Sequence, residues 1–283
     1  MSAQTETTRK ALKKIAGQAD DGIDLAEAAL LLAALDHPTA DLTPYREHLN
    51  SLADTVHDTA NARHGDDPLG PEEMAAVLNA VMVDQFGYAG DDETYEDLDN
   101  ANLMRVIERR RGLPVALGIL YIFAARSQGW SAAGLNFPNH FLIRLESSDG
   151  RRVIIDPFHK GRTMGAPELR ELLKMVAGPG VELEAGHYRP VSNRDVLMRL
   201  QNNVKARRLD KGEIAGAVDA VESMLVLSPE TAGLWREAGV LYMRSGQLKR
   251  SVEAFEGFVS RSESGPDRDK IAKVINELRE RLS

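Results

Sequence analysis

One segment near the middle of the chain is apolar on almost every side. In "LPVALGILYIFAARSQG", the residues from Val115 to Phe123 carry no charge, and Pro114 suits the first turn of a helix, where proline is tolerated. A helix that is apolar all round is buried on most sides. The sequence therefore predicts a buried helix over residues 114–128, and such a helix needs neighbours on most of its faces.

The N-terminal hundred residues are predicted to be mostly helical. Apolar residues recur at helical spacing over residues 22–35, and Asp24 is placed to cap that helix. Pro44 lies in the first turn of a second helix, and residues 71–87 form a third. Residues 1–20 are polar and lack a clear period, so we expect them to be frayed.

The one basic cluster, Arg109 to Arg111, lies in an otherwise acidic neighbourhood. A solvated helix face with internal ion pairs explains such a cluster, and an anion-binding patch is the alternative. We expect Arg110 to pair with a carboxylate and Asn100 to cap the helix that follows it. The formal net charge of −8 argues against nucleic acid or an anionic membrane as the main partner, because both need a dense basic surface.

Residues 137–158, "FPNHFLIRLESSDGRRVIIDPF", are predicted to form two strands joined by a turn at Asp149–Gly150. His140 and Asp156 lie near the two ends of this hairpin. The hairpin folds Asp156 back alongside His140, but the pattern alone leaves the register open. A helix over residues 166–177 and a connector follow.

The chain contains no cysteine. This absence excludes disulfides, thiolate nucleophiles, redox thiols and every zinc site that needs sulfur. Seven histidines remain, but none falls in a spacing such as H-E-x-x-H, so we expect no metal site and no cofactor. His159 lies three residues after Asp156 and is a candidate third group beside His140 and Asp156, but a lone histidine in a loop usually faces solvent.

The last third of the chain carries a 34-residue repeat of helices. Large and small residues stand at relative spacings 0, 4, 7, 11 and 20 in one unit: Trp235, Gly239, Tyr242, Gly246 and Phe255. When the two units are aligned with a shift of 34 residues, Gly212 corresponds to Gly246, Ala217 to Ser251 and Val221 to Phe255. This pattern resembles the tetratricopeptide repeat over about residues 195–283, in which small residues let paired helices approach and aromatic residues fill the space between neighbours. The last helix, "DRDKIAKVINELRERL", then resembles a terminal cap.

The motifs "NANLMRVIERRRGLPVALGILY", "FPNHFLIRL" and "IIDPF" resemble the bacterial SirB1 family, a branch of the transglutaminase-like superfamily, over about residues 70–165. The resemblance implies a papain-like site, in which a helix carries a nucleophilic cysteine near its first turn and adjacent strands carry a histidine and an aspartate. His140 and Asp156 match the last two positions. The cysteine position falls at Pro114, and residues 112–123 contain no serine or threonine, so acyl transfer of the cysteine type is ruled out.

The fold class that follows is α+β. A mostly helical N-terminal region leads into a transglutaminase-like, papain-like core with a small antiparallel sheet, and an all-α array of tetratricopeptide-like repeats follows. We expect two domains, residues 1–190 and residues 191–283.

A histidine–aspartate pair without its nucleophile has two interpretations. His140 and Asp156 are a buried hydrogen-bonded pair or the remnant of a binding cleft. Alternatively they are a general base, in which Asp156 holds the tautomer while His140 activates water. A cleft between the helix N-terminus and the strands would be lined by Pro114, Asn139, His140 and Asp156 and would favour an anionic group, such as the C-terminus of a peptide.

Three functions remain open. The leading hypothesis is a catalytically degenerate protein that acts as a scaffold and binds a protein or peptide partner through the cleft or the helical repeats. The alternatives are a hydrolase that uses the His140–Asp156 dyad and a structural subunit of a larger complex. The longest apolar run, "LAEAALLLAALDHP", is too short to span a bilayer, and the start of the chain lacks a signal-peptide pattern, so we expect a cytoplasmic protein. The pattern leaves the oligomeric state open.

Overall fold

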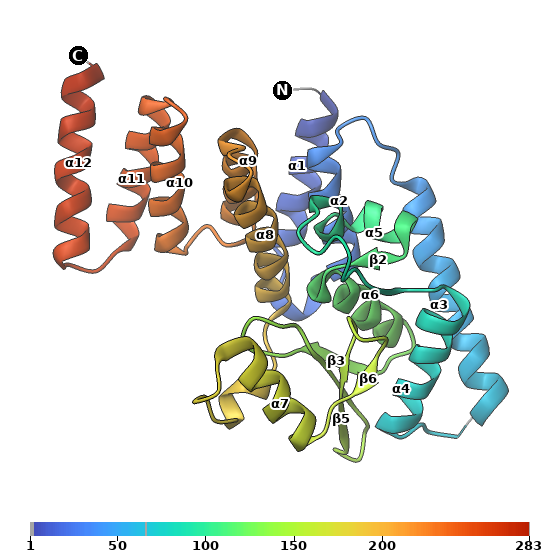
Figure 1. The fold of residues 1–283 in the computed structure, drawn as a ribbon. Helices are drawn as coiled ribbons and strands as arrows, with labels where there is room; N and C mark the ends of the chain where they lie inside the picture. Colours follow the sequence, from blue (N-terminus) through green and yellow to red (C-terminus); the bar gives the residue numbers. More distant parts are fainter. Residues whose placement is uncertain (1–2, 66, 283) are drawn as a thin grey trace.

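Helices make up most of the structure, and they surround one central helix (Figure 1). The computed structural model describes residues 3–65 and 67–282, and its central helix is α6 (Pro114–Ser127). Eleven of the 14 residues of α6 are buried, which confirms the prediction of a helix covered on most sides. The helices that precede it are α1 (Ala3–Ala16), α2 (Leu25–Asp36), α3 (Thr43–His64), α4 (Pro71–Asn79) and α5 (Leu103–Arg109). Four of these, α2 to α5, contact α6.

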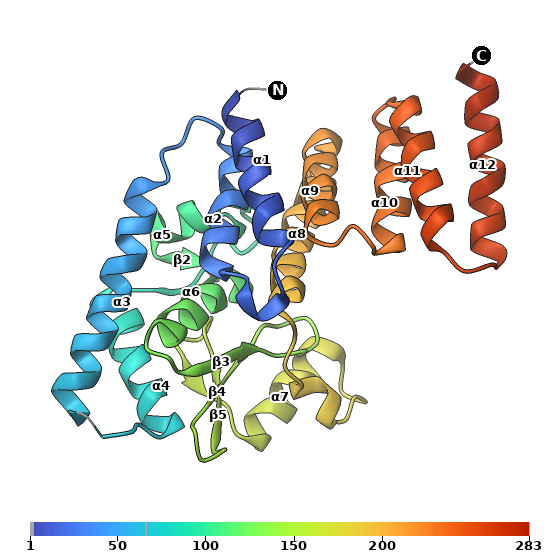
Figure 2. The same ribbon diagram turned by 180° about the vertical axis from the view of Figure 1, so that it is seen from behind.

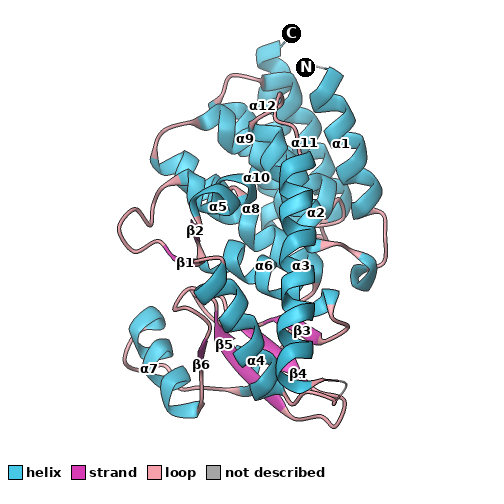
Figure 3. Cartoon of the chain, turned by 90° about the vertical axis from the view of Figure 1, so that its right-hand side faces the viewer, coloured by secondary structure: helices cyan, strands magenta, loops and turns pink. Residues whose placement is uncertain are grey.

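A four-stranded antiparallel sheet lies beside α6 (Figure 3). Its strands, in spatial order, are β3 (Ser131–Gly134), β4 (Ile143–Glu146), β5 (Arg152–Asp156) and β6 (Arg162–Thr163). The register pairs Ile143 with Ile155, and the turn between β4 and β5 includes Gly150, as predicted. Gly118 of α6 permits the close approach, because a Cβ atom there would lie 2.4 Å from the ring of Phe141. Two short strands, β1 (Ala89–Gly90) and β2 (Arg111–Gly112), form a separate parallel pair.

The remaining helices are α7 (Ala166–Ala177), α8 (Asn193–Asp210), α9 (Ile214–Leu227), α10 (Ala232–Arg244), α11 (Leu248–Arg261) and α12 (Pro266–Leu282). Gly212 and Gly246 occupy equivalent turns between paired helices, with φ angles of 74° and 76°, a conformation that favours glycine. A Cβ atom at Gly239 would lie 2.4 Å from the ring of Phe255, so these two helices touch where the pattern places a small residue. The 34-residue repeat is therefore present in the structure.

The aromatic residues of the second unit have different environments. Tyr242 is buried, and its hydroxyl donates to Glu222 at 3.1 Å. Trp235 is half-buried and donates its Nε1 hydrogen to the carbonyl of Pro229 at 2.7 Å, which fixes the loop between the units. Both residues therefore hold helices and loops of the repeat together.

The two repeat units differ in what they contact. Helix α8 packs against α2 and α6, and α9 packs against α1. Helices α10, α11 and α12 extend away from the first part of the chain (Figures 1 and 2). The first unit is therefore docked on the core, and the second projects from it. None of the helices in the described ranges is both long and apolar enough to cross a membrane.

The prediction that residues 1–20 are frayed is wrong for the part of this segment that the structure describes. Helix α1 buries Leu12 fully, and Arg9 pairs with Glu222 of α9 at 3.0 Å. Asp20 accepts hydrogen bonds from the backbone nitrogens of Asn193 and Arg194 at 2.8 and 3.0 Å, so it binds the first turn of α8 beside the N-cap residue Ser192. The polar segment is ordered by contacts with residues more than 170 positions away, which a local pattern does not reveal.

Two predictions near the basic cluster are also wrong. The cap of α5 is Asn102, whose side chain accepts from Met104 and Arg105. Asn100 is fully buried, and its Nδ2 donates to the carbonyl of Thr94 at 2.7 Å. The ion pairs expected of the basic cluster are present in part, since Arg109 pairs with Asp91 at 2.9 Å.

Arg110 contacts aromatic rings and a histidine, and it makes no ion pair with a carboxylate of the described residues. Its Nη1 donates to the Tyr88 hydroxyl at 2.6 Å, and its guanidinium lies 4.9 Å from the centre of the Tyr88 ring. His48 Nε2 lies 2.8 Å from the same hydroxyl. Burial, and then the charge of Arg110, lower the pKa of His48 to about 4. His48 therefore stays neutral in the folded protein at pH values where a free histidine is protonated.

The His48→Gln variant is expected to lose less stability in acid than the wild type. Between pH 6.5 and pH 4 the unfolded chain binds a proton at His48 that the folded chain does not, so stability falls as the pH falls through this window. We expect this group to cost about 1.5 kcal/mol by about pH 4.5, a figure reduced because the side chain is partly exposed and screened. Urea unfolding of both proteins from about pH 7 to pH 4.5 measures the difference, and parallel stability profiles contradict the prediction.

Candidate functional site

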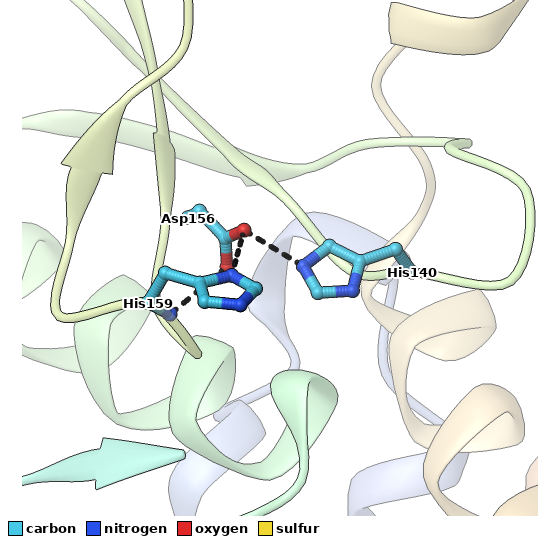
Figure 4. Close-up of side chains that lie close together, drawn as sticks. All are labelled: His140, Asp156 and His159. Carbon is cyan, nitrogen blue, oxygen red and sulfur yellow. Dashed lines mark hydrogen bonds and ion pairs between the residues drawn. The ribbon is translucent and has the colours of Figure 1, made fainter. Parts of the chain in front are cut away.

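His140 and Asp156 meet at one end of the antiparallel sheet (Figure 4). His140 lies in the loop of residues 135–142 that leads into β4, and Asp156 is the last residue of β5. Because Ile143 pairs with Ile155, the hairpin brings both side chains to the same end. The Nε2 atom of His140 donates to Oδ2 of Asp156 at 2.9 Å. The register that the sequence left open thus places the pair in direct contact.

Asp156 is buried and receives four hydrogen bonds. Its Oδ1 accepts from the backbone nitrogens of Phe158 and His159 at 3.0 and 3.3 Å, and its Oδ2 accepts from the rings of His140 and His159. Burial acts to raise the pKa of Asp156, but the hydrogen bonds and charges of the two histidines outweigh burial and leave this pKa below its usual value. The group is therefore a carboxylate, and the ring nitrogens that face it carry the hydrogens.

His159 is part of the cluster, as one of the two interpretations weighed from the sequence had it. Its Nδ1 donates to Oδ2 of Asp156 at 2.7 Å, and its ring is stacked at 26° to that of His140. The side chain remains 52% exposed, so the expectation of a solvent-facing residue is only half correct. The turn in which Asp156 binds the backbone of His159 directs this ring back toward the carboxylate. An aspartate followed three residues later by a histidine was the available signal.

Pro114 and His140 line the same cavity, which has a volume of about 800 Å³. The cavity lies between the N-terminus of α6, the loop of residues 135–142 and α8. Asn139 also lines it, while its Nδ2 donates to the carbonyl of Val176 at 3.0 Å. Asp156 does not line the cavity, because only 1% of it is exposed. Three of the four residues predicted for the cleft are therefore on its wall, and Asp156 supports His140 from outside it.

Arg199 of α8 holds the loop that carries His140. Its guanidinium donates to the carbonyl oxygens of Leu135, Phe137 and His140 at 3.3, 2.6 and 3.2 Å. It also lies 5.8 Å from the centre of the Phe141 ring, and burial lowers its pKa. The first repeat helix thus fixes the position of the histidine, and the cavity depends on the docking of α8 on the core.

Several other lining residues were missed by the sequence analysis. Asn202 and Ala206 come from α8, Arg189 comes from the connector before it, and Asn136 comes from the loop beside His140. No local pattern marks them, because they reach the cavity only when the first repeat unit packs on the core. The chemistry of this site is therefore shared between the two domains expected from the sequence.

The arrangement has a base but no thiol to pair with it. Nε2 of His140 is bound to Asp156, and Nδ1 makes no hydrogen bond within the described residues and is not fully buried. In a papain-like site a ring nitrogen in this position faces the thiol. Here Pro114 occupies the helix N-terminus, so the site has the means to bind a ligand or to polarise a water molecule but not to form a thioester.

Two regions of the chain match known protein families. Residues 43–202 match the model described as transglutaminase-like superfamily, and residues 204–276 match the tetratricopeptide repeat. The first match includes the cavity wall formed by α6, the loop beside His140 and most of α8. The two matches confirm the resemblances to the transglutaminase-like superfamily and to the tetratricopeptide repeat that the sequence motifs indicated.

Bacterial relatives match most of the chain. A UPF0162 protein of Xylella fastidiosa (strain 9a5c) is 31% identical over 230 residues, covering 80% of this chain and 80% of its own length. The protein SirB1 of Salmonella typhimurium is 24% identical and covers 91% of both chains. F-box only protein 21 of Mus musculus is 26% identical over 68% of this chain and 34% of its own length. The likeness to the first two extends over the core and the repeats.

Proposed function

We propose, since this chain belongs to the transglutaminase-like superfamily and within it to the UPF0162 and SirB1 proteins, that it binds a peptide segment of a partner protein in the cavity beside His140. One observation carries the proposal: a cavity of about 800 Å³ opens on Pro114 and His140 in a chain that has no thiol. This volume is within the range of ligand sites. A cleft that holds an acyl substrate in an enzyme then serves for binding alone.

The polar groups of the cavity wall support a peptide as the ligand. The Asn136 side chain makes no hydrogen bond with any described residue, and the Asn202 carboxamide only accepts one, from Lys205 at 2.8 Å. A free carboxamide offers the donor and acceptor pair that an extended peptide backbone needs. Arg189 is exposed, and its guanidinium has no partner in the described parts of the chain, so it is available to a ligand carboxylate.

The Ala206→Trp variant is expected to lose peptide binding. Ala206 is exposed on α8 and lines the cavity, so an indole there fills space that the ligand needs without disturbing the core. Peptides selected from a random display library on the full-length wild-type chain are measured against both proteins by calorimetry. We expect the affinity to fall at least about tenfold, which corresponds to about 1.4 kcal/mol.

Ala62→Trp makes the same change on the exposed part of α3 and serves as the matched control. It is expected to leave the affinity within about twofold of wild type. Peptides that bind Ala206→Trp as tightly as the wild type place the binding surface elsewhere and refute the cavity as the site.

The second candidate is a hydrolase, and the unpaired Nδ1 of His140 favours it. In that reaction His140 takes a proton from water while Asp156 holds the ring. The same selected peptides distinguish the two functions by mass spectrometry after long incubation. Intact peptides support binding alone, and fragments that disappear with the His140→Ala variant support the hydrolase.

A further inference from the structure

We infer that His140, Asp156 and His159 form a binding site for a divalent first-row transition-metal ion, such as Zn²⁺ or Fe²⁺. The three residues each offer one ligand atom, and these atoms all lie within 4.8 Å of one another. Two imidazoles and one carboxylate are the donor set that such ions accept while retaining open coordination positions. Ion binding does not require the proposed peptide ligand, although His140 also lines the cavity.

The three ligand atoms lie close enough together to share one ion. Nε2 of His140 and Nδ1 of His159 lie 2.9 and 2.7 Å from Oδ2 of Asp156. Two ligand atoms at a right angle, each about 2.1 Å from an ion, are about 3.0 Å apart, and at a tetrahedral angle about 3.4 Å apart. The nitrogen–oxygen distances fall slightly short of this range, and the two nitrogens lie within 4.8 Å of each other. Because both N–H groups now point at Oδ2, the rings or the carboxylate turn when an ion binds all three atoms. An ion takes the place of the two hydrogens that now point at one oxygen.

The groups around the cluster hold its carboxylate in place. Oδ1 of Asp156 is fixed by the backbone nitrogens of Phe158 and His159, which leaves Oδ2 for the ion. The ring of Phe158 meets those of His140 and His159 edge-on, with centroid distances of 6.2 and 5.2 Å. One side of the site is therefore apolar. The half-exposed His159 gives the ion a path from solvent.

The protons balance without a change in charge on the rings. Each imidazole stays neutral when its hydrogen moves from the coordinating nitrogen to the other one, which is Nδ1 in His140 and Nε2 in His159. Neither of these nitrogens has a hydrogen-bond partner within residues 3–65 and 67–282. Because His140 lines the cavity, loading with the ion turns its free Nδ1 from an acceptor into a donor. The ion thus sets the polarity that the cavity offers to a ligand.

Titration with Co²⁺ and Zn²⁺ tests the site on the full-length chain after treatment with a chelator. We expect one ion per chain, with visible d–d absorption when Co²⁺ is the probe. His159→Asn removes one ligand at a half-exposed position and is expected to weaken binding at least about tenfold while the circular dichroism stays unchanged. Asp156→Asn, read in the same assay, is expected to weaken it further.

His187→Asn is the control, because this histidine lies outside the cluster and its ring accepts from the backbone of Glu184. It is expected to leave ion affinity unchanged. Binding that is equally strong in His159→Asn, or no binding of either ion at about 1 mM, overturns the inference. Peptide affinity is also measured in the presence of chelator. Because no ion is bound there, this affinity tests the proposed peptide binding separately from the metal site.

Discussion

The Asp156→Ala variant is expected to lose about 3 kcal/mol of the free energy of unfolding, because its removal leaves buried hydrogen-bond donors without an acceptor. Four hydrogen bonds end on this carboxylate, two from backbone nitrogens and two from the rings of His140 and His159. Urea unfolding at about pH 7, with chelator present, gives the free energy directly. The same change should release both rings, which nuclear magnetic resonance of the histidine side chains detects.

Two further variants serve as references for the stability of Asp156→Ala. Asp156→Asn keeps an oxygen for the backbone nitrogens but does not accept well from both rings, so we expect a loss of about 1.5 kcal/mol. Asp58→Ala, on the exposed face of α3, should change stability by less than about 0.5 kcal/mol. An Asp156→Ala protein as stable as Asp58→Ala contradicts the view that the carboxylate organises this end of the sheet.

The pH dependence of this contribution has a definite sign. The pKa of Asp156 is depressed in the folded protein, as burial is outweighed by the two histidines, so its stabilisation is fully present above the pKa of the unfolded chain. It is lost as the pH falls through the lower pKa of the folded state. The difference between wild type and Asp156→Ala should therefore stay constant near neutral pH and shrink in strong acid.

The Arg199→Leu variant is expected to loosen the loop of residues 135–142 and to cost about 2.5 kcal/mol of stability, because buried carbonyl groups lose a charged donor. Three carbonyl oxygens of this loop depend on that guanidinium, including that of His140. Hydrogen exchange followed by mass spectrometry should show at least about tenfold faster exchange over residues 135–142. Affinity for the selected peptides should fall with it, since the loop forms one wall of the cavity.

Arg199→Lys retains a charge but not the fork of donors, and we expect an intermediate loss of about 1 kcal/mol. Arg236→Leu removes an exposed arginine of α10 whose side chain pairs with Asp267 at 3.4 Å, and it serves as the control. Exchange in the loop that does not differ between Arg199→Leu and Arg236→Leu refutes the positioning role of Arg199.

The elements with strong local signals were predicted correctly. Pro114 and the apolar run after it define α6, and the helix expected over residues 166–177 has those bounds. Asp24 caps α2 as expected, since its side chain accepts from the nitrogen of Glu27. These features depend on residues within one or two turns of each other, so a single sequence contains the information that fixes them.

The wrong predictions concern contacts between distant segments. Arg110 was expected to find a carboxylate, but the fold offers it Tyr88 and His48. His159 is the exception, because it lies only three residues after Asp156. It was expected to face solvent as a lone loop histidine, yet the turn after β5 returns its ring to Asp156. The cavity also draws on α8, which the sequence assigns to another domain. Contacts between segments far apart in the chain are set by packing, and they produce no periodic pattern in the sequence.

The contact between Asp20 and the start of α8 joins residues 173 positions apart. A ribosome releases α1 and α2 long before it releases the helices that cover them, because α8 and α9 end only at Asp210 and Leu227. Closing so long a loop is slow compared with forming helices. During synthesis the faces of α2 and α1 that α8 and α9 cover therefore stay open until those helices have emerged, and chaperones can reach them in that interval.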